Sequence, residues 1–173
     1  VGAGTLRTKA DATNAKIAGS QFAVSPGYSS NMGSICKEID LPLLPGVSSG
    51  SEIMMANDDG YDFLKLFPAV AVGGVNLLKG FSGPFADVKF CPTGGVTIQN
   101  ASDFLALPNV IVCGGTWLTP KEYVNQKNSI CSKLDIEITT STDLSSKGNL
   151  YGSSRTTSTF LPLTISMPIY SIL

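Results

Sequence analysis

Lys65 is the residue whose setting most strongly suggests chemistry. It occupies the apolar run 63–68, with phenylalanines two positions before and two positions after it. If this run is a buried strand, lowering the lysine pKa from about 10.4 to near 7 takes roughly 4 to 5 kcal/mol, which desolvation between the two rings could supply. A neutral amine attacks carbonyl groups and forms a Schiff base, which then draws electrons from a breaking carbon–carbon bond. The alternative is a lysine on an edge strand whose amino group reaches water.

Two double glycines are the next candidates for a functional role. Gly94-Gly95 follows Cys91-Pro92-Thr93, and Gly114-Gly115 follows Val112-Cys113, so both lie where a strand is expected to give way to a helix. Glycines at such places let backbone N–H groups approach an anion, and the start of the helix adds a favourable dipole. With Thr93 and Thr116 beside them, the pairs favour a phosphate site over glycines that merely form tight turns.

Composition excludes several other kinds of chemistry. The 173 residues suit one domain, and 12 basic against 13 acidic residues provide no cationic face for nucleic acid. With no histidine, and four cysteines without a close pair, zinc sites, disulfide frameworks and histidine bases are disfavoured. We therefore expect no metal. No stretch is long and apolar enough for a membrane span, and we expect a cytoplasmic protein.

The elements that must position these residues follow a repeated pattern. Short apolar runs alternate with stretches of helical length, which is typical of β-α units. Strands are predicted at 1–5, 22–26, 42–46, 63–68, 88–93 and 110–115, and helices at 9–18, 31–39, 49–58, 75–81 and 100–106. Near-continuous apolar strands indicate a parallel sheet covered on both sides. Unit spacing of about twenty residues favours a small closed barrel over an open sheet, with the site at the carboxyl ends of the strands.

Glutamates within the predicted helices are given structural roles. Ser49 and Glu52 have the spacing of a capping box, so Ser49 is predicted to begin the third helix. The side chains of Glu38 and Glu52 are expected to be solvated.

Several short motifs, taken together, resemble one family. In order and spacing they are similar to the bacterial 2-keto-3-deoxy-6-phosphogluconate (KDPG) and 4-hydroxy-2-oxoglutarate (KHG) aldolases. The resemblance extends from Val1 to about Pro120 and includes Ser25-Pro26-Gly27, Leu44-Pro45-Gly46, Leu64-Lys65-Leu66-Phe67-Pro68-Ala69, Pro92-Thr93-Gly94-Gly95 and Gly114-Gly115-Thr116-Trp117-Leu118.

This resemblance implies a class I aldolase on a (β/α)8 TIM barrel, usually a homotrimer. Such an enzyme cleaves a phosphorylated 2-keto-3-deoxy sugar acid to pyruvate and glyceraldehyde 3-phosphate, with no metal or organic cofactor. Lys65 matches the Schiff-base lysine. Thr5, Pro26 and Phe67 match residues at the pyruvate end of the site, and Gly94, Gly95 and Thr116 match the phosphate-binding positions.

The sequence also departs from the family pattern. In the family, a glutamate base and an arginine that grips the substrate carboxylate lie on the second barrel strand. This sequence begins at the third, so we expect a barrel truncated at the amino end, with strands 3 to 8 visible. Val70 stands where these aldolases commonly carry an acidic residue.

The end of the sequence differs from a barrel helix. We predict a partial barrel domain over residues 1–137, and over 138–173 a Ser/Thr-rich linker that ends in an apolar extended segment. Two hypotheses stay open: an aldolase whose amino-terminal part is not included, or a noncatalytic fragment that binds a phosphorylated ligand. Within the first, KHG or the galactonate-derived epimer are alternative substrates.

Overall fold

The computed structural model describes residues 1–116 and 169–170, and strands alternate with helices along the chain. The strands are β1 (Gly2–Ala3), β2 (Phe22–Val24), β3 (Leu43–Leu44), β4 (Gly46–Val47), β5 (Phe63–Leu66), β6 (Lys89–Pro92) and β7 (Ile169–Tyr170). The helices are α1 (Lys9–Ile17), α2 (Ser30–Glu38), α3 (Gly50–Asp58), α4 (Gly74–Phe81) and α5 (Ala101–Leu105). Each of the five predicted helices is thereby confirmed to within a residue or two.

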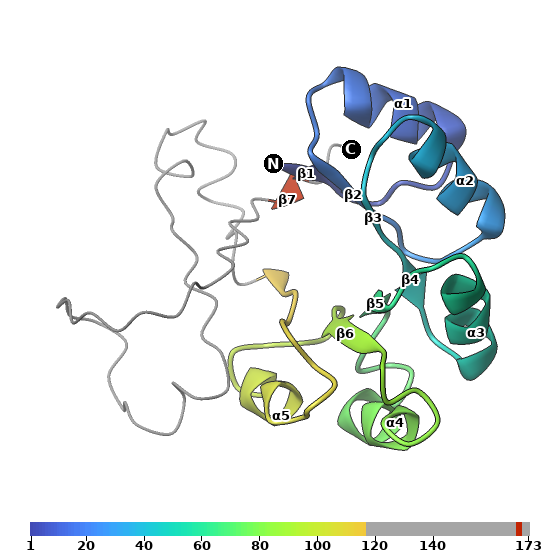
Figure 1. The fold of residues 1–173 in the computed structure, drawn as a ribbon. Coiled ribbons are helices and arrows are strands. Elements are labelled where there is room, and N and C mark those ends of the chain that lie inside the picture. Colours follow the sequence, from blue (N-terminus) through green and yellow to red (C-terminus); the bar gives the residue numbers. More distant parts are fainter. Residues whose placement is uncertain (117–168, 171–173) are drawn as a thin grey trace, which may run out of the picture.

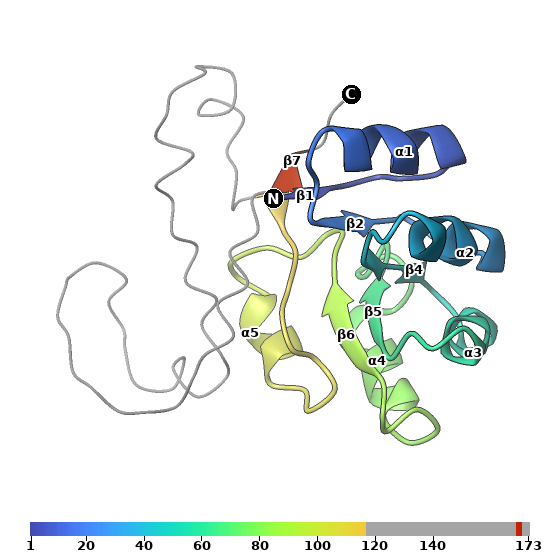
Figure 2. The same cartoon turned by 45° about the horizontal axis from the view of Figure 1, so that its top comes forward.

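All strand pairs are parallel, which confirms the predicted α/β class. One sheet has the order β3-β2-β1-β7 and the other the order β4-β5-β6. Figure 1 shows the helices along an outer arc with the strands inside it, and the turned view in Figure 2 keeps this arrangement. The carboxyl ends of the strands therefore lead into loops at one rim.

The segment between β2 and β5 corrects the prediction of one strand over 42–46. It forms two short strands, β3 and β4, separated by Pro45. The Leu44 carbonyl accepts from Ser25 N–H at 3.2 Å, whereas the Pro45 carbonyl accepts from Lys65 N–H at 2.8 Å. Because proline has no N–H, one rung of the ladder is missing here, and the two sheets meet at this point.

The predicted strand over 110–115 is also wrong as a continuous element. Within the described residues, two isolated bridges connect it to β6 and to the residue after that strand: Val110 pairs with Phe90, and Gly114 pairs with Thr93. The first bridge joins residues 20 apart and the second joins residues 21 apart, so one extra residue lies between them. An extra residue interrupts the ladder locally, as a bulge does.

Short polar side chains fix where the helices begin. Thr8 Oγ1 accepts from Asp11 N–H at 3.2 Å, and Asp11 Oδ2 accepts from Thr8 N–H at 2.9 Å, which completes a capping box at α1. Ser49 Oγ accepts from Glu52 N–H at 3.4 Å, so Ser49 caps α3 as predicted. The box at Thr8 was missed, because Asp at the third position is a less usual partner than Glu.

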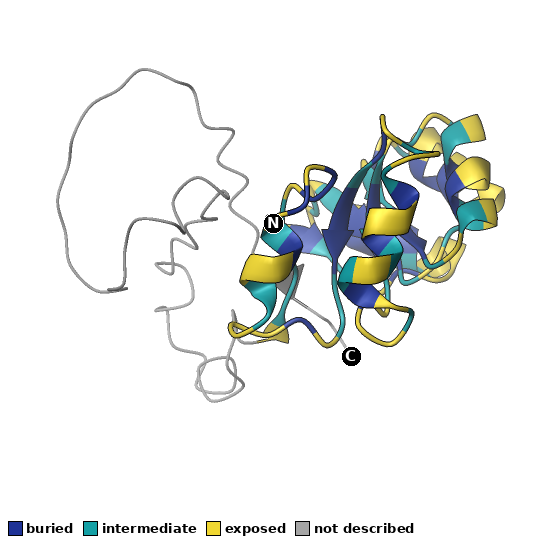
Figure 3. Cartoon of the chain, turned by 90° about the horizontal axis from the view of Figure 1, so that it is seen from below, coloured by how far each residue is buried: buried dark blue, intermediate teal, exposed yellow. Residues whose placement is uncertain are grey.

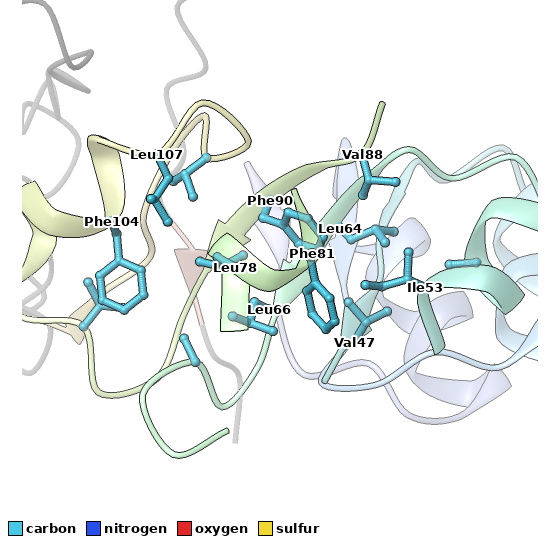
Figure 4. Packing of buried hydrophobic residues seen from close by; sticks show 14 residues of the cluster. Val47, Ile53, Leu64, Leu66, Leu78, Phe81, Val88, Phe90, Phe104 and Leu107 are labelled. Atoms are coloured by element: carbon cyan, nitrogen blue, oxygen red, sulfur yellow. The ribbon is translucent and has the colours of Figure 1, made fainter. Parts of the chain in front are cut away.

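Two separate clusters of buried side chains hold the sheets to the helices. The larger cluster joins β4, β5 and β6 to α3, α4 and α5; Figure 4 shows Leu64, Leu66 and Phe90 from the strands facing Ile53, Leu78 and Phe81 from the helices. The smaller cluster joins β2 to α1 and α2 and contains Leu6, Ala12, Ala15, Ala23, Met32, Ile35, Cys36 and Leu41. Figure 3 shows the same layering, with buried strands and exposed outer faces on the helices.

Among the described residues, none of the helices combines the length and the apolar character needed to cross a bilayer. The predicted boundary at 137 and the Ser/Thr-rich linker lie outside the described residues. Ile169 and Tyr170, from the expected apolar extended segment, form β7 beside β1 at the edge of the first sheet.

Candidate active site

Lys65 lies on the central strand of the second sheet, with β4 on one side and β6 on the other. Leu64 and Leu66 are fully buried in the larger cluster, whereas Lys65 and its neighbours Phe63 and Phe67 are half-buried. Since successive side chains of a strand point to opposite faces, Lys65 faces away from the helices. The alternative of an edge strand is therefore wrong.

The surroundings of the Lys65 amine favour its neutral form. Burial lowers the pKa of Lys65 from its ordinary value, because a charged amine loses hydration there. The amine lies 4.4 Å from the centre of the Phe67 ring. Within the described residues the only ion pair joins Lys16 and Asp40, so no carboxylate there offsets the desolvation of Lys65. The predicted pair of flanking rings is observed as a contact with one ring, that of Phe67.

The turn after β6 places the first double glycine beside Phe67. Gly94 and Gly95 have φ values of 94° and 77°, in the left-handed region that favours glycine. Val70 N–H donates to Gly94 O at 3.0 Å, which ties this turn to the segment after β5. A Cβ built on Gly94 would lie 3.3 Å from the Phe67 ring. The structure thus brings Gly94, Phe67 and Lys65 into one neighbourhood.

The second double glycine differs from the first. Gly114 N–H donates to Pro92 O at 2.9 Å, and a Cβ on Gly114 would lie 2.6 Å from Thr93 Oγ1. Gly114 is therefore required by a close approach to Thr93, and neither it nor Gly115 has a positive φ. Thr116 follows at an exposed position, and Trp117 lies outside the described residues.

Thr5 and Pro26 follow β1 and β2, at the same strand ends as the rest of the predicted site. Thr5 has a φ of 62°, an uncommon conformation for a residue with a side chain, and it is exposed. A Cβ on Gly46 would lie 2.4 Å from the carbonyl group of Pro26, so the two backbones are in contact. Gly46 in turn pairs with Lys65, so only the strand β4 lies between Pro26 and the strand that carries the amine.

A cleft of about 270 Å³ opens between these loops, lined by Leu6, Arg7, Pro26, Gly27, Tyr28, Ser29, Met32 and Glu52. Glu52 is not solvated as predicted: its Oε2 accepts from Ser48 N–H at 2.7 Å, Ser48 Oγ at 2.8 Å and Ser49 Oγ at 3.0 Å. Burial by itself would raise the pKa of Glu52, but these hydrogen bonds outweigh it and lower the pKa. Glu52 and Arg7 were not predicted as site residues. The Ser49–Glu52 spacing signalled the cap alone.

The family model "KDPG and KHG aldolase" matches residues 1–132. The chain belongs to this aldolase family. The Pseudomonas aeruginosa 2-dehydro-3-deoxy-phosphogluconate aldolase is 48% identical over 126 residues, which is 73% of this chain and 57% of that protein. The Escherichia coli KHG/KDPG aldolase is 44% identical over 122 residues, 70% of this chain and 57% of that protein.

Solved structures of the family agree. A KDPG aldolase from Legionella pneumophila, crystallised with pyruvate captured at low pH as a covalent carbinolamine intermediate, superposes with a TM-score of 0.69 at 43% identity. The match covers 72% of this chain and 61% of that one. The chain therefore spans about 57 to 61% of the length of these aldolases. The family predicted from the motifs is confirmed.

Proposed function

We propose that this chain carries the Schiff-base half of a class I aldolase site, which cleaves KDPG to pyruvate and glyceraldehyde 3-phosphate with Lys65 as the nucleophile. The observation that supports this most directly is the position of Lys65. Its amine is desolvated, faces away from the helical layer on a central strand, and has no carboxylate partner within the described residues.

The chemistry follows from a neutral amine. The Lys65 nitrogen attacks the C2 ketone, the carbinolamine loses water, and the resulting iminium accepts the electron pair when the C3–C4 bond breaks. The C4 hydroxyl must lose its proton to a base in that step. Since no carboxylate of the described residues pairs with Lys65, we assign this proton transfer to water or to a carboxylate outside the described residues.

The substrate has an anionic group at each end, and the residues proposed here include a matching part for the phosphate. Gly94 and Gly95 offer backbone N–H groups to the phosphate, and Thr116 adds a hydroxyl. Thr5, Pro26 and Phe67 line the pyruvate end. The left-handed turn at Gly94-Gly95 and its contact with Phe67 support the assignment, because both lie next to Lys65.

The proposal extends to the architecture and the assembly of the protein. The parallel strands within an arc of helices support a (β/α)8 barrel of which strands 3 to 8 belong to residues 1–137. A homotrimer, a cytoplasmic location, and use of a phosphorylated 2-keto-3-deoxy sugar acid without a metal or organic cofactor complete the proposal.

Borohydride trapping with pyruvate tests it. The unaltered protein should gain a covalent adduct, located on Lys65 by peptide mass spectrometry, and Lys65→Met should abolish the adduct while retaining similar side-chain volume. Lys89→Met is the matched control. Lys89 lies on the same face of the neighbouring strand, but its amine donates to Pro108 O at 3.2 Å. An adduct that survives Lys65→Met, or that disappears in Lys89→Met alone, would exclude Lys65 as the nucleophile.

No carboxylate of residues 1–116 pairs with Lys65, which favours one second candidate, a noncatalytic fragment that binds a phosphorylated ligand. In a folded sample such a protein would form no pyruvate adduct on Lys65 and would release no pyruvate from KDPG. Pyruvate release from KDPG, its galactonate-derived epimer and KHG, measured side by side, distinguishes the noncatalytic fragment from an aldolase with a different substrate.

A further inference from the structure

Tyr28 connects two parts of the fold that otherwise pack separately. It lies in the loop between β2 and α2, yet its side chain packs against the larger cluster of buried residues. The Tyr28 ring meets the Tyr61 ring edge-on, with 5.4 Å between the ring centres. Among the described residues, Tyr28 is the one side chain before Val47 that joins this cluster.

The hydroxyl of Tyr28 is held between two helices that follow one another along the outer arc (Figure 1). It donates to Oδ2 of Asp59, the residue at the end of α3, at 2.6 Å. On α2, a Cβ built on Gly33 would lie 2.5 Å from the same hydroxyl oxygen, so the hydroxyl fits there because residue 33 has no side chain. Hydrogen bonds to a carboxylate are stronger than those between neutral groups. This contact therefore ties the loop to the end of α3.

The loop that Tyr28 anchors also carries Pro26, and both residues line the cleft of about 270 Å³. On one side, the Pro26 backbone is in contact with Gly46. Gly27 separates Pro26 from Tyr28, and no atom lies within 4 Å of a Cβ built on Gly27. Because Gly27 has free space beside it, the position of Tyr28 limits where Pro26 can lie.

We propose that Tyr28 is a positioning residue for the pyruvate end of the site: its hydrogen bond to Asp59 holds the loop, and with it Pro26, in the place that a bound keto acid requires. The inference rests on the proposed function and deepens it. Tyr28 acts through Pro26, and attack on the carbonyl carbon is left to Lys65. Loss of the hydrogen bond lowers the fraction of protein that is competent to bind, which weakens ligand binding by the same factor.

The test measures borohydride trapping as a function of pyruvate concentration, which separates the half-saturating concentration from the limiting rate. Tyr28→Phe removes the hydroxyl and keeps the ring. The half-saturating concentration should rise about three- to tenfold, which corresponds to the net contribution of one hydrogen bond. The limiting rate should stay within about twofold, since Lys65 lies on a separately supported strand.

Substitutions of Asp59 supply the conservative rescue. Asp59→Ala should match Tyr28→Phe, whereas Asp59→Asn should bind pyruvate nearly as well as the unaltered protein, because its amide oxygen still accepts from the hydroxyl. Lys37→Met is the matched control. The Lys37 amine also binds Asp59, at its backbone carbonyl and at 2.6 Å, but from α2 and not from the loop, so its loss should leave the half-saturating concentration unchanged.

Gly33→Ala perturbs the same hydroxyl from the other side. In the unaltered protein the new methyl group displaces the Tyr28 hydroxyl, so the half-saturating concentration should rise. In the Tyr28→Phe background it should rise by a smaller factor, because the hydroxyl is already gone. Equal factors in the two backgrounds would show that Gly33 does not act on binding through Tyr28.

An unchanged half-saturating concentration in Tyr28→Phe, or an equal rise in Lys37→Met, would overturn the positioning role. Where Tyr28→Phe does not fold, Asp59→Ala against Asp59→Asn carries the same comparison. NMR order parameters of the Gly27 and Ser29 amides need no ligand: Tyr28→Phe should lower them from about 0.85 towards 0.6, and unchanged values would also overturn the role. Absence of any adduct in the unaltered protein would refute the proposed function, and the order parameters would still decide whether Tyr28 fixes the loop.

Discussion

The first half of the described chain, residues 1–44 with α1 and α2, buries smaller side chains than the second half, residues 46–106 with α3 to α5. Alanines supply three of the eight buried residues of the smaller cluster, Ala12, Ala15 and Ala23. The larger cluster contains the phenylalanines Phe81, Phe90 and Phe104, together with the two leucines next to Lys65.

This difference shows how the molecule divides its tasks. The second half provides the rigid support: Leu64 and Leu66 fix β5, so the lysine between them is held in one orientation. The first half contributes loops, with Thr5 and Pro26 at its strand ends. The proposed nucleophile needs fixed geometry more than a proposed binding loop does, so a place on the half with the larger buried side chains is physically reasonable.

The largest expected effect compares one leucine from each half. Leu64→Ala should lower the free energy of unfolding by about 4 kcal/mol, and Leu41→Ala by about 2 to 3, because a cavity among large side chains collapses less completely. Both side chains are at most 2% exposed. Urea unfolding followed by circular dichroism measures both. An equal loss of unfolding free energy at Leu41 and Leu64 would contradict a difference in strength between the smaller and the larger cluster.

The contact between the halves is tested next, at Gly46. A Cβ there would lie 2.4 Å from the Pro26 carbonyl group, so Gly46→Ala should cost about 2 kcal/mol and reduce pyruvate trapping as the loop shifts. Gly27→Ala is the control, because no atom lies within 4 Å of a Cβ built there. If both substitutions have the same effect on the urea midpoint, the backbone contact has no energetic role.

A smaller effect depends on pH. The pKa of Glu52 is lowered in the folded protein, so its hydrogen bonds stabilise the fold above the ordinary value of 4.5 and are lost as the pH falls through the folded value. Glu52→Gln should therefore cost about 1 kcal/mol at pH 7 and progressively less as the pH falls below 4.5. Asp11→Asn, in the first half, should show the same direction with a smaller amplitude, since Asp11 is fully exposed. A Glu52→Gln cost that is constant between pH 3 and 7 would refute this role.

The smallest expected effect concerns the helix caps. Thr8→Ala should cost about 1 kcal/mol and Ser49→Ala about 0.5, because Thr8 completes its capping box whereas the carboxylate of Glu52 binds Ser48 N–H instead. Thermal unfolding of the two variants, with Thr8→Ser as a conservative control, gives the comparison. The reverse order would show that a complete capping box does not strengthen the cap.

Local patterns predicted most of the elements. The apolar run around Lys65 indicated a strand, and Ser49 indicated the start of α3. Both signals come from residues that are neighbours in the sequence. Contacts between distant segments could not be predicted in this way. The pairing of Lys65 with Cys91, the approach of Gly46 to Pro26, and the extra residue before Gly114 all depend on register, which short motifs do not encode.

Pro45 has a consequence for the shape of the wall that carries Lys65. A continuous ladder resists bending across the strand direction, and at Pro45 a step without a donor lies between the two sheets. Curvature can therefore concentrate at Pro45. On one side of it the carbonyls of Pro42 and Leu44 accept from the first sheet, and on the other side the carbonyls of Pro45 and Val47 accept from Lys65 and Phe67. Part of the curvature of the wall that carries Lys65 therefore arises where a proline ring takes the place of an N–H donor.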